Sequence, residues 1–203
     1  MPRLIDLAMR NHRLHAYRQR AIGATSGAVL EIGVGSGQNL PLYGSAVDHV
    51  CAIDPSAELL LLARNRTANG PTPVSLVRGS AEQIPFASAV FDTIVTTWTL
   101  CSIPNPVAAL VEMRRVLKPG GKLLFVEHGL SPELRVARWQ HCLTTCWKRI
   151  AGGCHLDRKI DDLIRSTGFR LGAIETHYMD GPKLMTFMYQ GQAIPEPAGR
   201  SHG

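Results

Sequence analysis

The chain has 203 residues, of which 45% are hydrophobic and 19% charged, with a formal net charge of +6 and five cysteines. This length fits one domain with a substantial core, and the apolar runs are much shorter than the roughly 20 residues that span a bilayer. Five cysteines without framework spacing favour free thiols in a reducing compartment, so we expect a cytoplasmic location.

The positive charge is concentrated in residues 1–20, with five arginines against one aspartate, and in residues 133–170, with eight Lys or Arg against four acids. Solvated helix faces are the simpler interpretation, and peripheral contact with an anionic membrane is the alternative. Because no basic run is interleaved with aromatic residues, we expect no nucleic-acid partner. The first twenty residues resemble neither a secretory signal nor a spanning anchor.

The elements before residue 130 alternate between helix and strand. The apolar, β-branched runs that predict strands are residues 28–33, 49–55, 74–79, 91–100 and 121–129. The patterns that predict helices are residues 4–23, 56–69 and 105–121. Asn105 and Pro106 supply a helix start signal, and Pro119-Gly120-Gly121 a stop signal. Such alternation predicts an α/β fold with a parallel sheet covered on both faces.

The remaining elements follow residue 130. Residues 133–150 and 159–169 have helical patterns, and residues 170–179 and 184–194 alternate like strands around the turn at 180–182. This arrangement predicts a closing antiparallel hairpin, and therefore one reversed strand near the edge of the sheet.

The stretch VLEIGVGSGQNLP, residues 29–41, runs from an apolar strand into Gly33, Gly35 and Gly37. Ligands of open α/β sheets bind beyond the carboxyl ends of the strands, and glycine lets them approach the backbone. A dinucleotide fingerprint would place its third glycine at position 38, where this chain has Gln38. The spacing therefore opposes a nicotinamide-dependent dehydrogenase, which remains an alternative by fold analogy alone.

Asp54 ends the second predicted strand. A carboxylate at that position in a nucleotide-binding sheet accepts hydrogen bonds from ribose hydroxyls. The alternative is an Asp-Pro pair that only begins the next helix. Its place at the carboxyl end of a strand favours the ligand-binding role.

Five segments in order and spacing resemble the motifs of class I S-adenosylmethionine-dependent methyltransferases of the methyltransferase type 11 kind: VLEIGVGSG, AIDPS, GSAEQIPF, FDTIVTTWTL and RRVLKPGGKLLFVEHG. The resemblance covers about residues 28–130. It implies S-adenosylmethionine as the cofactor and a Rossmann-like, doubly wound sheet of seven mostly parallel strands, with one antiparallel strand and helices on both faces.

The resemblance also assigns the cofactor-binding residues, which are Glu31, Gly33, Gly35, Gly37, Asn39, Asp54, Pro55, Ser80, Ala81, Glu82 and Thr97. The glycines would pack on the methionine and ribose portion, Asp54 would bind the ribose, and the backbone near Thr97 would hold the amino group. Residues 80–82 would border the adenine. Many relatives have aspartate in place of Ser80, and a hydroxyl makes a weaker contact with the adenine amine.

The domain organisation that follows is one methyltransferase domain over residues 1–192. It comprises an N-terminal cap helix (1–25), a cofactor-binding core (28–130), a cap over the acceptor site (131–160) and a closing helix and hairpin (161–192). Residues 193–203 are predicted to be a disordered tail. The sequence indicates no oligomeric state.

Three further segments, TWTLCSIP, EHG and WQHCLTTCWKRIAGGCHLDR, look like those of mammalian microsomal alkyl-thiol methyltransferases and of bacterial phospholipid and quinone methyltransferases. They imply methylation of a small, fairly apolar acceptor, with thiols favoured. The alternatives are N-methylation of a phospholipid amine headgroup and C- or O-methylation of a quinone-like molecule. A non-catalytic domain that binds S-adenosylmethionine is a further alternative.

His128 follows the fifth predicted strand and is the candidate catalytic base, since an imidazole can accept a proton from a thiol. Its alternative role is to position the cap. The candidates for lining the acceptor site are Trp98, Cys101, Trp139, Trp147 and His155. Core packing is the simpler interpretation for the tryptophans at 139 and 147.

The residues His141, Cys142, Cys146, Cys154 and His155 are possible metal ligands by type. Cysteines at i and i+4 share a helix face, but there is no C-x-x-C knuckle, and free cysteines commonly pack in apolar surroundings. We therefore predict no metal from the sequence.

Overall fold

The structure is a computed structural model that describes residues 12–67 and 70–197. It contains a seven-stranded sheet in the order β3-β2-β1-β4-β5-β7-β6. The strands are β1 (Gly27–Ile32), β2 (Val47–Asp54), β3 (Val74–Arg78), β4 (Phe91–Thr97), β5 (Leu117–His128), β6 (Phe169–Tyr178) and β7 (Phe187–Pro195). β7 alone runs antiparallel to its neighbours, so the prediction of a mostly parallel sheet with one reversed strand is confirmed.

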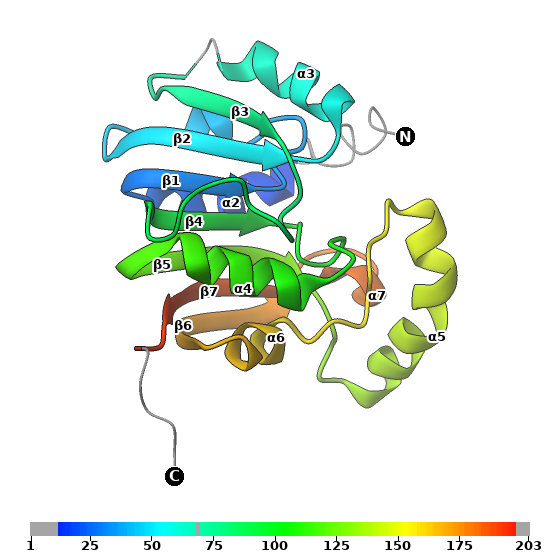
Figure 1. Ribbon diagram of the computed structural model, residues 1–203. Coiled ribbons are helices and arrows are strands. Elements are labelled where there is room, and N and C mark those ends of the chain that lie inside the picture. The colour runs from blue at the N-terminus through cyan, green and yellow to red at the C-terminus, as the bar shows by residue number, and fades with distance from the viewer. Residues whose placement is uncertain (1–11, 68–69, 198–203) are drawn as a thin grey trace.

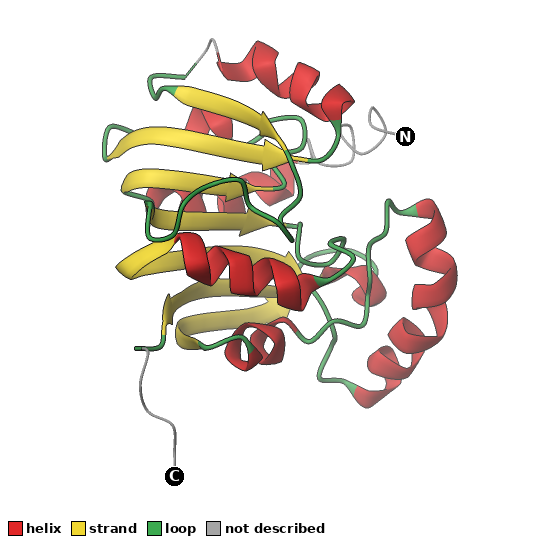
Figure 2. Cartoon of the chain, viewed as in Figure 1, coloured by secondary structure: helices red, strands yellow, loops and turns green. Residues whose placement is uncertain are grey.

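Helices cover both faces of the sheet (Figures 1 and 2). They are α2 (His12–Gly23), α3 (Ala57–Thr67), α4 (Pro106–Val116), α5 (Leu134–Ile150), α6 (Ile160–Ser166) and α7 (Lys183–Thr186), with a 3-10 turn η1 (Leu40–Leu42). Adjacent strand residues point to opposite faces. Leu30 therefore belongs to the core cluster beneath α4 and α6, whereas Val29 belongs to the cluster beneath α2 and α3. This two-sided burial explains why the strands are continuous apolar runs.

Local signals in the sequence account for several boundaries. The Asn105 side chain accepts a hydrogen bond from the Ala108 N–H and caps α4, as its position predicted. The prediction that the helix ends at Pro119-Gly120-Gly121 is wrong, because α4 ends at Val116 and β5 begins at Leu117. Leu117 already pairs with Phe91 of β4, so sheet pairing extends the strand backward through the turn residues.

The N- and C-terminal predictions need two corrections. The predicted helix 4–23 corresponds to α2 from His12 onward, and residues 4–11 lie outside the described residues. The predicted disordered tail began too early, because β7 continues to Pro195 and pairs with β6 there. Buried Ala193 anchors this last part of the strand.

α5 stands beyond the carboxyl ends of the strands, on the right of Figure 1, and a loop through residues 151–159 returns the chain to α6. No helix within residues 12–67 and 70–197 has the length and hydrophobicity of a bilayer span.

Candidate active site at the carboxyl edge of the sheet

A cavity of about 330 Å³ lies where the loops after β1, β2, β3 and β4 meet. The sequence-predicted residues that line it are Gly33, Gly35, Asp54, Pro55, Ser80, Ala81, Thr97 and Trp98. Those outside the lining are Glu31, Gly37, Asn39, Glu82, Cys101, His128, Trp139, Trp147 and His155. The structure therefore brings most of the predicted cofactor residues together but separates them from most of the predicted acceptor residues.

Gly33 and Gly35 both have left-handed backbone, with φ of +69° and +54°. A Cβ at Gly33 would lie 2.4 Å from Thr99 Cγ2, so this position is closed by the neighbouring loop. A Cβ at Gly35 would meet nothing closer than 4.0 Å, and Gly35 lines the cavity. The missing side chain at Gly35 thus leaves free space for a ligand against the backbone.

Gly37 has a different role from the one that the resemblance implies. Its φ is +82°, and a Cβ there would lie 2.9 Å from Leu40 Cδ1 and 3.0 Å from Ala63 Cα. The third glycine therefore permits close packing of the loop against α3, and it does not face the cavity.

The carboxylate of Asp54 joins the glycine loop to the start of α3 by accepting a hydrogen bond from each. Its Oδ2 accepts from the Gly35 N–H at 2.9 Å, and its Oδ1 accepts from the Ser56 N–H at 2.9 Å. Burial raises the pKa of Asp54 above its ordinary value, and these two backbone donors oppose the rise. The carboxylate borders the cavity and has lone pairs left for ligand hydroxyls.

Glu31 lies beneath the loop in a buried polar network. Asn39 donates to Glu31 Oε1 at 2.8 Å, and the Tyr43 hydroxyl donates to Oε2 at 2.9 Å. Burial raises the pKa of Glu31 to about 7, against the effect of these hydrogen bonds and of the nearby charge of Arg18. Asn39 also donates to Thr97 Oγ1 at 3.0 Å, so the network joins the loop after β1 to the end of β4.

Arg18 reaches this network from α2 and was not predicted as a site residue. Its Nη1 donates to Asn39 Oδ1 at 2.7 Å, and its guanidinium lies 4.8 Å from the centre of the Trp98 ring. Burial lowers the pKa of Arg18 to about 10, but the group stays charged at neutral pH. The sequence signal available was only an arginine among the apolar residues of a predicted helix.

The end of β4 is held by a second buried acid, Glu127 of β5. Glu127 accepts from the Thr99 N–H at 2.9 Å, and burial raises its pKa to about 7. The chain turns at Trp98, whose φ is +51°, an unusual value for a bulky residue. Trp98 lines the cavity in this conformation, and its predicted role at the acceptor site stays a prediction.

The loop after β3 supplies one border of the cavity through Ser80 and Ala81. The Ser80 hydroxyl accepts from the Glu82 N–H at 3.1 Å. Glu82 itself points elsewhere, because its Oε1 accepts from the Asn105 N–H at 2.6 Å and ties this loop to the start of α4.

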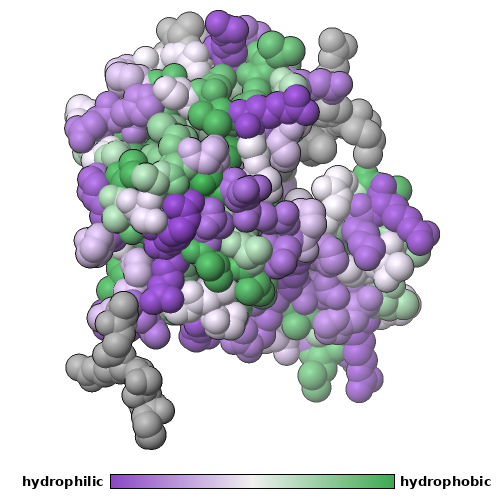
Figure 3. All heavy atoms as spheres, in the orientation of Figure 1, coloured by the Kyte–Doolittle hydropathy of each residue, from purple (hydrophilic) through white to green (hydrophobic). Residues whose placement is uncertain are grey.

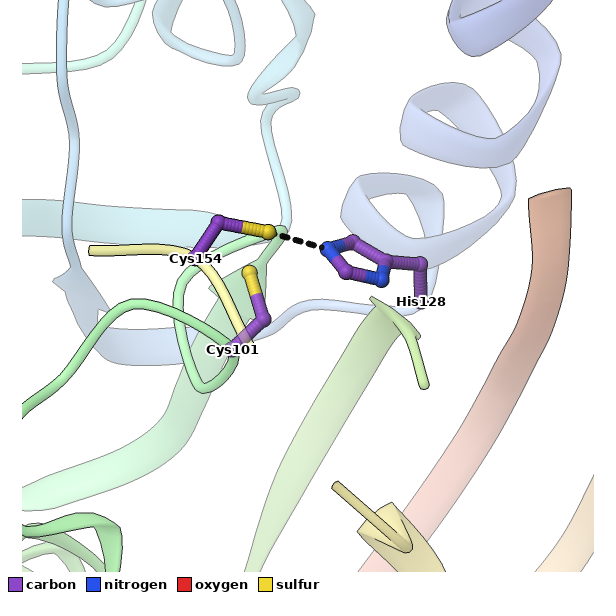
Figure 4. A group of neighbouring side chains, drawn as sticks. All are labelled: Cys101, His128 and Cys154. Atoms are coloured by element: carbon purple, nitrogen blue, oxygen red, sulfur yellow. Dashed lines mark hydrogen bonds between the residues drawn. The ribbon is translucent and has the colours of Figure 1, made fainter. Parts of the chain in front are cut away.

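Cys101, His128 and Cys154 form a separate cluster beside the cavity (Figure 4). His128 Nε2 lies 2.9 Å from Cys154 Sγ, and the candidate donor atoms of the three residues are all within 4.8 Å of one another. Cys101 Sγ lies 3.6 Å from the Trp98 carbonyl oxygen and 3.5 Å from Ser102 Oγ. Since Trp98 and Ser102 line the cavity, the cluster lies directly behind its wall.

Residues of the helix α5 do not line the cavity. Trp139 is 60% exposed, so the core role predicted for it is wrong, and neither Trp139 nor half-buried Trp147 lines the cavity. Cys142 and Cys146 are exposed, and His141 Nδ1 lies 3.2 Å from Asp157 Oδ2. His155 faces the same Asp157, with Nδ1 3.7 Å from Oδ1, so the five possible metal ligands of residues 141–155 do not converge on one point.

The cavity fits a nucleoside bearing an amino-acid chain. Gly35 leaves backbone open to it, Asp54 supplies an acceptor for sugar hydroxyls, and Ile53, Leu59 and Ile103 provide apolar surface. Within the cavity lining, Arg18 and Asp54 are the charged residues.

Comparisons with known proteins agree with this geometry. Residues 30–125 match the family model described as a methyltransferase domain. The chain is 32% identical to a phosphatidylethanolamine N-methyltransferase of Cereibacter sphaeroides, over 82% of this chain and 81% of that protein. It is 35% identical to thiol S-methyltransferase TMT1B of Rattus norvegicus, over 64% of this chain and 55% of that protein, and thus spans about half of that relative's length.

The fold also matches a solved structure, a putative methyltransferase of Bacillus halodurans C-125, with a TM-score of 0.69 and 21% identity. That alignment covers 89% of this chain and 95% of the other. The protein is a methyltransferase whose cofactor is S-adenosylmethionine, and the chain belongs to the class I S-adenosylmethionine-dependent methyltransferases.

Proposed function

We propose that this protein methylates the sulfur of a small, fairly apolar thiol. The observation that supports a sulfur acceptor is Arg18, the cation of the cavity lining, which lies over the face of Trp98. A guanidinium there stabilises an electron-rich attacking thiolate and opposes a cationic ammonium acceptor. Ile103 and Pro104 make the adjoining surface apolar.

The residues that would hold the cofactor are Gly35 and Asp54, with Ser80 and Ala81 at the far border. When bound, S-adenosylmethionine supplies an electrophilic methyl group on a sulfonium sulfur. The chain's own contribution is alignment, which can supply up to about 7–11 kcal/mol in the best cases. The networks around Glu31 and Glu127 fix the ends of β1 and β4 and so provide that alignment.

The test is a methyl-transfer assay of the purified chain with S-adenosylmethionine, alkyl thiols and alcohols of matched size. We expect S-adenosylhomocysteine and a methyl thioether to form in equal amounts with the thiols, and no product from the alcohols. Mass spectrometry identifies the methylated atom. If no thiol is methylated while vesicles of phosphatidylethanolamine yield an N-methyl product, the thiol proposal is wrong.

A second candidate, N-methylation of a phospholipid amine, is favoured by the surface of α5. This helix buries polar Gln140 and Thr144 and exposes apolar side chains, namely Leu134, Trp139, Leu143 and Ile150. With about 3.6 residues per turn, Trp139, Leu143 and Ile150 share one face of α5, and Leu134 lies on the opposite side. The basic residues along one edge of this apolar face are Arg135, Arg138 and Arg149. In Figure 3, green spheres are interspersed with purple ones over α5, as expected of a helix that lies at an anionic interface.

We expect the double substitution Trp139→Glu and Leu143→Glu to weaken binding to anionic vesicles by about 100-fold or more, since two buried side chains at about 1.5–3 kcal/mol each contribute about 3–6 kcal/mol together. Cosedimentation at low salt measures this. The matched control is Val107→Glu with Val111→Glu on α4, which are also exposed and should leave binding unchanged. Equal vesicle binding by both variants, or none by the wild type, would refute this surface as a membrane contact.

A further inference from the structure

Cys101, His128 and Cys154 come from three different segments that meet behind the cavity wall. Cys101 follows β4, His128 ends β5, and Cys154 lies in the loop after α5 (Figure 4). Cys101 is 2% and His128 8% exposed, and Cys154 is partly buried. Two sulfurs and one imidazole nitrogen thus converge in a site from which bulk water is largely excluded.

Backbone hydrogen bonds hold the three segments together. The His155 N–H donates to the Cys101 carbonyl at 2.8 Å, and the Leu130 N–H donates to the Arg158 carbonyl at 2.8 Å. The Arg158 guanidinium in turn donates to the carbonyl oxygens of Leu100 and Ile103, the latter at 2.7 Å. The arrangement of donor atoms is therefore fixed by contacts that do not involve the donor atoms themselves, as in a preorganised site.

The cluster contains a polar atom that has no hydrogen-bond partner among the described residues. His128 Nδ1 is buried and has no hydrogen-bond partner among the described residues. Cys154 is a weak partner for Nε2, because a thiol is a poor donor and a poor acceptor. The Nε2 side of the ring, which faces the sulfurs, is thus poorly satisfied by the thiols alone, and a ligand bound between Nε2 and the two sulfurs would complete this site.

The donor set matches one kind of ligand. Thiolate and imidazole ligands are those of zinc, and catalytic zinc sites use three protein ligands, Cys2His among the known sets, with a fourth position open. In a tetrahedral zinc site the donor atoms lie about 3.3–3.8 Å apart. Donor atoms within 4.8 Å of one another, with one pair at 2.9 Å, reach that geometry by shifts of about 1 Å or less.

We propose that Cys101, His128 and Cys154 bind a zinc ion whose open position takes the sulfur of the methyl acceptor. This role of the open position rests on the thiol acceptor proposed above. Trp98 and Ser102 contact Cys101 and line the cavity, so a sulfur held there lies beside the methyl-transfer site. The exposed cysteines of α5, Cys142 and Cys146, take no part.

The chemistry balances without an oxidant or reductant. Zinc displaces the thiol protons of Cys101 and Cys154, and an acceptor RSH that binds the open position releases its own proton to solvent. A sulfur lone pair then forms the new S–CH3 bond as the sulfonium C–S bond breaks, giving RSCH3 and S-adenosylhomocysteine. The metal thus replaces the general base that the sequence assigned to His128, whose Nε2 is directed at Cys154.

The direct test titrates the metal-free full chain with zinc in competition with a colorimetric chelator. We expect about one zinc ion per chain, and weakening by about 100-fold or more in Cys101→Ser and Cys154→Ser. Cys142→Ser and Cys146→Ser are the matched controls and should bind like the wild type. Absence of zinc binding by the wild type, or equal binding by all four variants, would overturn the proposal. The wild-type titration tests the proposal even if a cysteine variant fails to fold.

Cobalt substitution reports on the acceptor position. The wild type with Co²⁺ should show a thiolate-to-metal charge-transfer band that is reduced in Cys154→Ser and altered when an alkyl thiol is added. Removal of the metal should reduce thiol methylation at least tenfold, with recovery on adding zinc. Full thiol methylation by the metal-free protein would overturn the metal's role and leave the thiol function intact. A different outcome is zinc binding that requires Cys101 and Cys154, with no spectral change on adding a thiol and no thiol methylation. That outcome would refute the thiol acceptor and leave the zinc site intact.

Discussion

Replacement of Asp54 by alanine is expected to weaken S-adenosylmethionine binding by about 30- to 150-fold, equivalent to 2–3 kcal/mol for a charged hydrogen-bond acceptor. The carboxylate borders the cavity. It also fixes the backbone of the surrounding loops, since it accepts hydrogen bonds from the N–H groups of Gly35 and Ser56. Calorimetric titration measures the affinity. Exposed Glu58, on the first turn of α3, is the control, because Glu58→Ala removes a nearby carboxylate that makes no contact with the cavity.

The two roles of Asp54 can be separated with a second ligand. S-adenosylhomocysteine without its 2′ and 3′ hydroxyls cannot donate to the carboxylate. If Asp54 binds the ribose, Asp54→Ala should reduce affinity for this analogue much less than for the normal compound. An equal reduction for both ligands would limit Asp54 to ordering the glycine loop, and unchanged affinity for S-adenosylmethionine would refute both roles.

Gly33→Ala is expected to lower the free energy of unfolding by about 2–5 kcal/mol, through left-handed strain and overpacking. The added Cβ would lie 2.4 Å from Thr99 Cγ2 and 2.5 Å from Thr99 Oγ1. Thr99 cannot simply rotate without cost, since its hydroxyl donates to the carbonyl oxygens of Ile32 and Thr97. Denaturant unfolding of the apo protein gives the difference.

Gly35→Ala is the matched comparison for this substitution. Its φ is also left-handed, but the added Cβ would come no closer than 4.0 Å to any other atom, so the free energy of unfolding should fall by only about 1–2 kcal/mol while cofactor affinity falls. Adding Thr99→Ala to Gly33→Ala should recover part of the lost stability. Equal destabilisation by the two glycine substitutions would mean that contact with Thr99 is not what requires glycine at position 33.

Elements with strong local signals could be predicted from the sequence. The run from Val29 into Gly33 and the cap at Asn105 specify a strand and a helix start within a few residues, and the structure contains both. The glycine spacing and Asp54 likewise located the cavity, because the carboxyl ends of parallel strands meet at one edge of the sheet.

Contacts between distant segments could not be predicted in the same way. Arg18 enters the site only because α2 packs against the sheet. The proximity of Cys101 to Cys154 likewise depends on the loop that follows α5 and returns to the sheet. For Trp139, the sequence predicts burial and the structure shows exposure. Bulky aromatic residues usually pack inside, but α5 stands away from the sheet and turns Gln140 inward, which leaves the indole exposed.

The position of β7 has a consequence for folding. This strand pairs with β5 on one side and β6 on the other, although β6 precedes it in the chain. Until residues 187–195 insert, both neighbours present unsatisfied backbone edges that can pair with other chains. β6 and β7 can pair locally as a hairpin, but the pairing of β7 with β5 joins segments far apart in the chain, so completion of this half of the sheet requires a non-local contact.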